Sequence, residues 1–232
     1  MSHLFTLIFL QPILNLLVWL YNVIPGHDIG MAIIILTILI KAVLYPLTVK
    51  QIRQQRALQD IQPKIEEIRN KYKDQKEEQA RELMALYSRE KVNPASSCLP
   101  LLVQLPIFIA LYRALSLGLS SKSLTLLYPF VANPQFIDTK FFGVFDLSHP
   151  APVLAIGAAV VQFFQSRQML KPPAATIAPP PPEVAGTEGA KDEGMAAMMN
   201  KQMMYLMPVM TAVIGFSLPG GLTLYWLVMS LL

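Results

Sequence analysis

The sequence predicts an all-α membrane protein, and two observations indicate that class. Of its 232 residues, 53% are hydrophobic and only 15% are charged, whereas ordinary soluble domains carry about 25% charged residues. The apolar residues also gather into runs of about twenty with few charges, the length at which a helix covers the ~30 Å hydrocarbon core of a bilayer. We therefore expect a five-helix core, a charged helical hairpin after its first helix, and an apolar helix ahead of the core.

Residues 1–28 are expected to form this N-terminal apolar helix and the turn that follows it. Residues 4–24 carry no charge, but they contain Pro12, Asn15 and Asn22. This pattern leaves two possibilities open, because such a helix either spans the membrane or lies in its interface.

The remaining residues, 29–232, are expected to form the core. Its predicted spans cover about residues 29–49, 98–119, 153–168, 201–218 and 222–232. The last span is ~16 Å long as a helix and too short to cross the hydrocarbon region, so we expect the sequence to be truncated within it. An aromatic-rich loop is predicted at 120–150, and a flexible Pro-rich linker at 171–194.

A block of mixed charge follows the first span at residues 50–92. It holds 11 of the 19 Lys and Arg residues and 8 of the 15 acids, whereas the loop at 120–150 holds two lysines. Because basic residues favour the cytoplasmic side, we expect the block and the linker to be cytoplasmic and the aromatic loop to be extracytoplasmic.

Apolar residues in the charged block follow heptad spacing, then a polar stretch, then a second apolar face. We expect two antiparallel helices packed as a hairpin, with Pro63 breaking or kinking the first. A passive solvated connector remains the alternative, although more than forty residues is long for a connection. The predicted hairpin residues are Leu58, Ile61, Pro63, Ile65, Ile68, Tyr72, Leu83 and Tyr87.

Lys41 is a charge within the first predicted span. A charge inside a membrane costs several kcal/mol in round terms unless it meets water or a partner, so Lys41 is a candidate functional residue. The alternative is a lysine that snorkels to the interface. However, Lys41 lies nine residues, ~14 Å, before Lys50, which is farther than a lysine side chain reaches.

Other polar residues are predicted near the depth of Lys41. Thr37 lies one turn away on the same face, while Gln104 and Gln162 lie ~10 Å and ~9 Å from the cytoplasmic ends of their spans. Such groups need partners or water, which favours a wet cavity open to the cytoplasm and sealed toward the outside. The alternative is that each glutamine independently bonds a neighbouring helix.

The sequence carries no enzyme motif that we recognise. It lacks a phosphate-binding glycine loop, an HExxH zinc motif and a Gly-x-Ser-x-Gly nucleophile turn. Cys98 is the single cysteine, and the three histidines are isolated in the sequence. We therefore expect no metal, no cofactor, no catalytic residues and no enzymatic activity.

Several ordered motifs resemble those of the YidC/Oxa/Alb membrane protein insertases. The similarity runs collinearly from about residue 29 to the end, and residues 4–24 resemble the segment that lies at the outer surface before this family's core. The matching motifs are IKAVLYPLT at 40–48, LQDIQPKI at 58–65, MALY at 84–87, EKVNP at 90–94, CLPLLVQLPIF at 98–108 and PGGLTLY at 219–225.

The resemblance implies an ATP-independent insertase with a hydrophilic groove open to the cytoplasm and to lipid. It places Lys41 where the family usually has a groove arginine, with Thr37, Gln104 and Gln162 as the expected polar lining. It also implies that substrate segments slide into lipid along the second and fourth spans. The expected slide residues are Leu101, Leu105, Phe108, Met203, Met207 and Met210.

The resemblance further implies a multi-pass protein of the bacterial plasma (inner) membrane. Its expected partners are nascent membrane proteins and the lipid bilayer. The ribosome, signal-recognition components and the Sec translocon are candidates, and we expect no direct reading of nucleic acid.

Two other functions remain open. The first is a small-solute transporter or channel with Lys41 lining an anion path, although paired broken helices, which mark a midplane site, are missing from the sequence pattern. The second is a membrane assembly scaffold whose hairpin binds partners.

Overall fold

The computed structural model describes residues 3–93, 99–119, 126–169, 205–206 and 208–232. The described residues form helices and one small two-stranded hairpin, so the predicted all-α class is confirmed. The chain divides into two compact units. The first comprises Met1–Tyr45, Leu101–Ser166 and Leu206–Leu232, and the second comprises Pro46–Pro100 and Arg167–Tyr205. The predicted linker at 171–194 lies outside the described residues.

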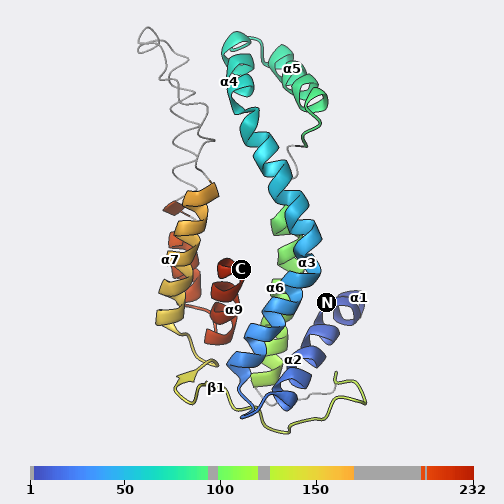
Figure 1. Ribbon diagram of the computed structural model, residues 1–232, viewed down its shortest axis with the longest axis vertical. Helices are drawn as coiled ribbons and strands as arrows, with labels where there is room; N and C mark the ends of the chain where they lie inside the picture. The colour runs from blue at the N-terminus through green and yellow to red at the C-terminus, as the bar shows by residue number, and fades with distance from the viewer. Residues whose placement is uncertain (1–2, 94–98, 120–125, 170–204, 207) are drawn as a thin grey trace. The chain divides into compact units, whose positions relative to one another are not determined.

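The N-terminal segment is helical throughout its described length. It begins as α1 (His3–Phe5), passes through a short π-helical stretch, η1 (Thr6–Leu10), and continues as α2 (Gln11–Val23) (Figure 1). Side chains on one face of α2 are almost completely buried. The helix therefore packs against the rest of the unit rather than standing apart from it.

The long helix α3 (Ile29–Asp60) begins at a side-chain cap. Oδ1 of Asp28 accepts hydrogen bonds from the N–H groups of Gly30, at 2.8 Å, and Met31, at 3.1 Å. These N–H groups have no acceptor within the helix, so the cap stabilises its first turn. The helix continues through Pro46 and ends immediately before the turn at Ile61.

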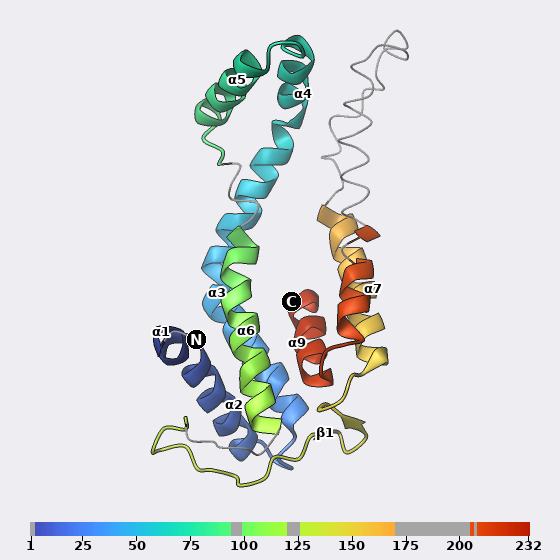
Figure 2. The same ribbon diagram turned by 180° about the vertical axis from the view of Figure 1, so that it is seen from behind.

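Three further named helices belong wholly or largely to the first unit: α6 (Leu99–Leu119), α7 (Pro152–Met169) and α9 (Gly220–Leu231). Residues 208–215 are also helical. Both ribbon views show α6 beside α3, and α9 between that pair and α7 (Figure 2). The central position of α9 allows its side chains to meet residues from several helices.

The apolar core of this unit draws on four helices and the loop between α6 and α7. Its largest fully buried side chains have less than 2% of their surface exposed. They include Leu14 and Leu17 of α2, Ile33 and Leu36 of α3, Leu111 and Leu115 of α6, Leu147 of the loop, and Leu222 and Tyr225 of α9.

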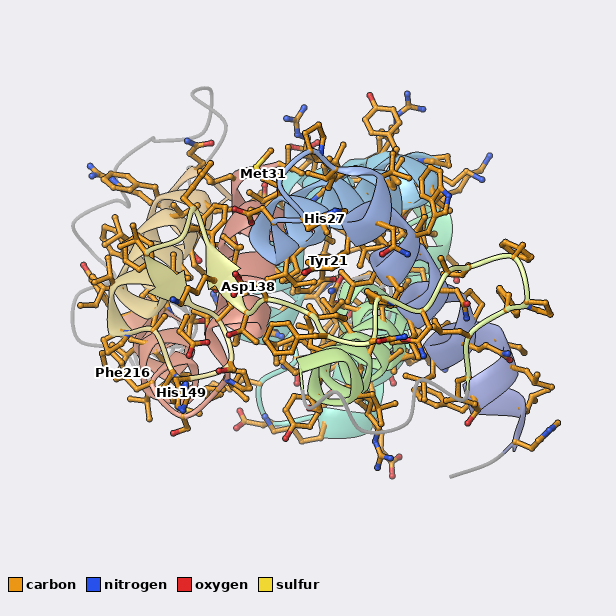
Figure 3. All side chains as sticks on the ribbon, turned by 90° about the horizontal axis from the view of Figure 1, so that it is seen from below. Tyr21, His27, Met31, Asp138, His149 and Phe216 are labelled. Atoms are coloured by element: carbon orange, nitrogen blue, oxygen red, sulfur yellow. The ribbon has the colours of Figure 1, made fainter. Side chains whose placement is uncertain are left out.

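The α6–α7 loop is fixed to α2 by hydrogen bonds to its backbone. Asn15, which is buried, donates to the carbonyl of Leu126 at 2.9 Å and accepts from the N–H of Tyr128 at 2.6 Å. The hydroxyl of Tyr21 accepts from the N–H of Asp138 at 2.9 Å (Figure 3). Polar residues within the apolar N-terminal helix therefore hold this loop in place.

A short hairpin in the same loop covers the start of α3. Strands β1 (Lys140–Phe141) and β2 (Phe145–Asp146) pair in antiparallel register. Oδ2 of Asp28 accepts a hydrogen bond from the N–H of Phe142 at 2.7 Å. One carboxylate therefore caps α3 and also holds the hairpin against it.

The end of the loop satisfies the first backbone groups of α9. The N–H of Gly220 donates to the carbonyl of His149 at 2.8 Å, and the N–H of Gly221 donates to that of Leu147 at 3.0 Å. A Cβ atom at Gly220 would lie 3.1 Å from the Cβ atom of Ala151, so glycine permits this close approach.

Substitution of Gly30 should destabilise the first unit, because a Cβ atom there would lie 2.1 Å from Cδ2 of Phe141. We expect Gly30→Ala to cost about 1–3 kcal/mol of unfolding free energy as the ring is displaced. Gly118→Ala is the matched control, since its Cβ would meet Ile137 at an ordinary 3.6 Å. Thermal unfolding in detergent measures both. Equal stability of the two variants would contradict the close packing, and adding Phe141→Ala should rescue Gly30→Ala.

Candidate functional site

Lys41 lies on α3 and its side chain is half-buried. Its Nζ donates a hydrogen bond of 3.3 Å to the backbone carbonyl of Met229 on α9. An ammonium group has three donor protons, and this bond uses one of them. Lys41 therefore reaches across to a neighbouring helix, and two of its donor protons are not used by this bond.

Gln104 lies on α6 and also contacts α9. Its side-chain nitrogen donates a hydrogen bond to the hydroxyl of Tyr225, whose side chain is 1% exposed. The tyrosine is therefore a polar group within the core whose hydroxyl is satisfied by the glutamine amide. The bond stabilises the buried tyrosine, because burying a hydroxyl without a hydrogen-bond partner costs free energy.

Helix α9 brings these two predicted residues together. Tyr225 and Met229 are four residues apart, so they lie on the same face of α9, ~6 Å apart along its axis. Lys41 from α3 and Gln104 from α6 bond to this one face. Sequence reasoning did not single out Tyr225 as a partner, although it lies within the PGGLTLY motif.

Thr37 is fully buried one turn before Lys41, and its hydroxyl donates to the carbonyl of Ile33 at 2.6 Å. That bond lies within α3 itself. The hydroxyl of Thr37 therefore donates its proton within α3 and not to another helix.

Gln162 on α7 is bonded to a different helix. Its Oε1 accepts a hydrogen bond of 2.8 Å from the hydroxyl of Thr211, which is 3% exposed and belongs to the helical residues 208–215. The structure thus groups Lys41 with Gln104 on α9 and pairs Gln162 elsewhere. The pairing of both glutamines with neighbouring helices also fits the alternative of independent interhelical bonds.

The predicted slide residues can be located in part. Leu105 of α6 and Met210 are about half exposed, whereas Phe108 is partly buried and meets the ring of Trp226 edge-on at 5.9 Å. Met203 and Met207 lie outside the described residues, as does the side chain of Leu101.

The structure reveals additional exposed apolar residues beside these positions. On α6 they recur at intervals of three and four residues, which places them on one face. The exposed residues of α6 are Leu102, Leu105, Ile109 and Tyr112, and those of the later segment include Leu206, Val209, Met210 and Val213. The same three- and four-residue spacing is visible in the sequence, and it could have predicted this exposed apolar face.

The second unit contains a pair of helices, α4 (Gln62–Lys71) and α5 (Lys76–Arg89), joined by a short turn. Pro63 lies in the first turn of α4, where its missing N–H costs little, and this explains the break after α3. Ile65 of α4 and Leu86 of α5 are each 2% exposed. They pack with Ile61, Val92, Ala57, Leu58, Ile68, Leu83 and Tyr87. Tyr72 follows α4 as its C-cap.

Val92 was absent from the predicted hairpin core, and the end of α5 explains its burial. Lys91 has a φ of 54°, and the chain turns back there. The N–H of Val92 bonds to the carbonyl of Tyr87, and that of Lys91 bonds to the carbonyl of Ser88. This is a Schellman motif, in which the residue after the turn packs on the last helical turn.

An ion pair also joins the two helices at their open ends. Nζ of Lys64 lies 2.7 Å from Oε1 of Glu90. The hydrogen bond and charge of Lys64 hold the pKa of Glu90 below its ordinary value. The carboxylate therefore stays ionised near neutral pH, and its contribution to the pair is lost as the pH falls through this lowered pKa.

Within the described residues, two helices are long and apolar enough to cross a membrane, His3–Val23 and Ile29–Asp60. Two shorter apolar helices, Leu102–Gly118 and Gly220–Leu231, accompany them.

A model of the 60Kd inner membrane protein family matches residues 19–232. The chain belongs to this family. Membership confirms the resemblance found in the sequence, and together with the two long apolar helices it indicates a membrane location.

Relatives within the 60Kd inner membrane protein family are similar over most of the chain. A protein from Syntrophobacter fumaroxidans, named membrane protein insertase YidC, is 35% identical over 96% of the chain. Proteins of the same name from Fusobacterium nucleatum and Oceanobacillus iheyensis are 35% and 34% identical over 88% and 90% of the chain. The matched regions cover 36%, 82% and 73% of these relatives, respectively.

The bond between Gln104 and Tyr225 should stabilise the contact of α6 with α9. We expect Tyr225→Phe and Gln104→Leu each to cost about 1–2 kcal/mol, because each leaves a polar group unpaired. The double variant should recover part of this loss, with a coupling energy of about 0.5–1.5 kcal/mol. Equilibrium unfolding in mixed micelles measures the cycle, and strictly additive losses would argue against the bond. Ser116→Ala is the control, since its hydroxyl bonds within α6.

Proposed function

We propose that the chain is a membrane protein insertase that moves short polar tails across the bilayer and releases hydrophobic segments into it. The observation that carries this proposal is Lys41, a cation within an apolar helix whose partner among the described residues is a neutral carbonyl at 3.3 Å. The names of the relatives support the same activity.

In this mechanism Lys41 binds the acidic tail of an incoming protein. The carbonyl of Met229 is a neutral acceptor, whereas a carboxylate forms a shorter and stronger charge-assisted bond with an ammonium group. A substrate carboxylate can therefore displace the resting contact. The groove around Lys41 is proposed to be hydrophilic and open to the cytoplasm, which shortens the apolar barrier to a polar tail.

The hydrophobic part of the substrate is proposed to leave along the exposed apolar faces of α6 and of the helical residues 208–215. Burial of its apolar surface supplies the driving force, at about 25 cal/mol per Å² removed from water. A membrane potential adds about 2.3 kcal/mol per 100 mV for each negative charge that moves outward. These two terms drive insertion without ATP hydrolysis.

The proposed orientation in the bacterial plasma membrane follows the distribution of basic residues, with the helical pair of α4 and α5 in the cytoplasm. The contacts of α2 suggest how the N-terminal helix lies. The side chains of Asn15 and Asn22 both bond backbone groups of the α6–α7 loop. Because irregular backbone is not tolerated in contact with hydrocarbon, we infer that this part of α2 lies at the outer surface.

The pair of α4 and α5 is proposed to receive nascent membrane proteins at the cytoplasmic face. The ribosome, signal-recognition components and the Sec translocon are the further candidate partners. A compact, charged pair of helices with its own apolar core is suited to contact a macromolecule, and this unit is stabilised by Leu86, Ile65 and the Lys64–Glu90 bond.

The charge of Lys41 is testable with purified protein in liposomes and a single-span substrate bearing an acidic N-terminal tail. We expect Lys41→Arg to retain the fraction of protease-protected tail. Lys41→Ala should reduce it on the order of tenfold or more, which corresponds to the loss of one charge-assisted bond. A substrate with a neutral tail is the matched control and should be less sensitive. Equal protection in wild type and both variants would show that the charge is dispensable.

The role of the helical pair is testable by disrupting its core. Leu86→Asp places a charge at a position that is 2% exposed and should greatly reduce insertion of the same substrate. Ala80→Asp adds the same charge at an exposed position of α5 and should be tolerated. The total helicity measured by circular dichroism controls for global unfolding. Unimpaired insertion by Leu86→Asp would exclude a requirement for the packed pair.

A further inference from the structure

The α6–α7 loop leaves large apolar side chains outside although its inward positions are already filled. Val131 and Ile137 in this loop are 5% and 2% exposed and belong to the core. A second set points away from it. The exposed fractions are 79% for Phe130, 68% for Phe136, 69% for Phe142 and 75% for Val144.

The backbone that carries these side chains is held by specific hydrogen bonds. Asn22 donates to the carbonyl of Ala132, two residues after Phe130, at 2.7 Å. The N–H of Phe136 bonds to the carbonyl of Pro134, and the N–H of Phe142 bonds to Asp28 at 2.7 Å. The exposure is therefore built into the fold of the loop.

Phe142 occupies an unfavourable backbone conformation at the tip of the hairpin. Its φ is 49°, and that of Gly143 is 70°. Positive φ is uncommon for a bulky residue, and such tips are usually formed by Asn, Asp or Gly. The conformation costs on the order of 1 kcal/mol, yet the ring it presents is mostly exposed. A strained and exposed aromatic residue indicates a role outside the packing of this unit.

The apolar exposure continues from the loop onto the neighbouring helices. α7 begins directly after the loop and exposes Val153 and Ile156, which lie on one face. α2, to which the loop is bonded, exposes Trp19 and Val23 near its end. In a membrane protein such faces meet lipid. This continuity favours lipid, rather than a soluble protein, as the partner of the loop.

The charged residues of the loop fit the same partner. The carboxylates of Asp138 and Asp146 accept hydrogen bonds from nearby backbone N–H groups, so they are engaged within the loop. Lys140, two residues before Phe142, is exposed, and a lysine stem can lie along apolar surface while its ammonium group reaches a phosphate. Aromatic residues are enriched at the boundary between headgroups and acyl chains for similar reasons.

We propose that Phe130, Phe136, Phe142 and Val144 form an interfacial anchor that inserts into the headgroup region of the outer leaflet. The anchor fixes the depth of α3, because Asp28 both caps this helix and holds the hairpin that carries Phe142. Lys41 lies thirteen residues farther along, ~20 Å from the cap. The anchor thereby sets the depth at which the cation stands in the bilayer.

Spin-label accessibility tests the anchor in the full chain, reconstituted in vesicles of phosphatidylethanolamine and phosphatidylglycerol. In a Cys98→Ser background, a label is attached at Phe136→Cys or Phe142→Cys. Val43→Cys, at a position that is 78% exposed on apolar α3, is the lipid reference, and Glu77→Cys, at an exposed position of α5, is the aqueous reference. Relaxation by oxygen and by a water-soluble nickel complex is measured for each.

We expect both loop labels to show oxygen and nickel accessibilities between those of the two references, as at the headgroup boundary. Nickel accessibility equal to that at the Glu77 position would place the loop in water and overturn the proposal. Exclusion of both reagents would indicate a protein covering the surface and would overturn it as well. The readout does not depend on insertion activity, so the anchor and the insertase proposal can fail separately.

Discussion

The structure depends above all on the need to pair every polar group that is removed from water. Among the described residues, each buried side-chain nitrogen or oxygen has a hydrogen-bond partner. Hydrogen bonds are directional, whereas hydrophobic packing is not, so in an apolar chain the polar groups constrain how the helices orient. Asn15 fixes the loop to α2, Asp28 joins α3 to the hairpin, and Gln104 joins α6 to α9. The few polar residues therefore decide which apolar surfaces meet.

The pairing of polar groups also shapes the candidate site. Within the part of the chain that the structure describes, Lys41 bonds to a backbone carbonyl and to no carboxylate, so the carbonyl does not neutralise its charge. Tyr225 and Met229 place two interhelical contacts on one face of α9. A stronger permanent partner would stabilise the contact of α3 with α9, but in the proposed mechanism it would make Lys41 a poorer receptor for an acidic tail. A tighter contact between α3 and α9 would therefore leave the Lys41 ammonium group less available to a substrate in the proposed mechanism.

The α6–α7 loop acts as the frame for three helices, because it bonds α2, the cap of α3 and the first N–H groups of α9. Gly30 and Gly220 permit the close approaches of the loop to α3 and α9. Little of this arrangement was visible in the sequence, where the loop showed only an aromatic composition. The loop is irregular, so neither helical nor strand periodicity signalled which of its residues face inward.

The sequence by itself determined the helical class, the family and the unusual charge at Lys41, because periodicity, composition and collinear motifs are local properties. It also predicted a break or kink at Pro63 and a shared apolar face in the charged block, since heptad spacing records which residues share a face. Tertiary structure alone decided that Gln104 bonds to Tyr225 whereas Gln162 bonds to Thr211. Depth along a helix can be counted from the sequence, but rotation toward a partner depends on how helices distant in the chain pack together.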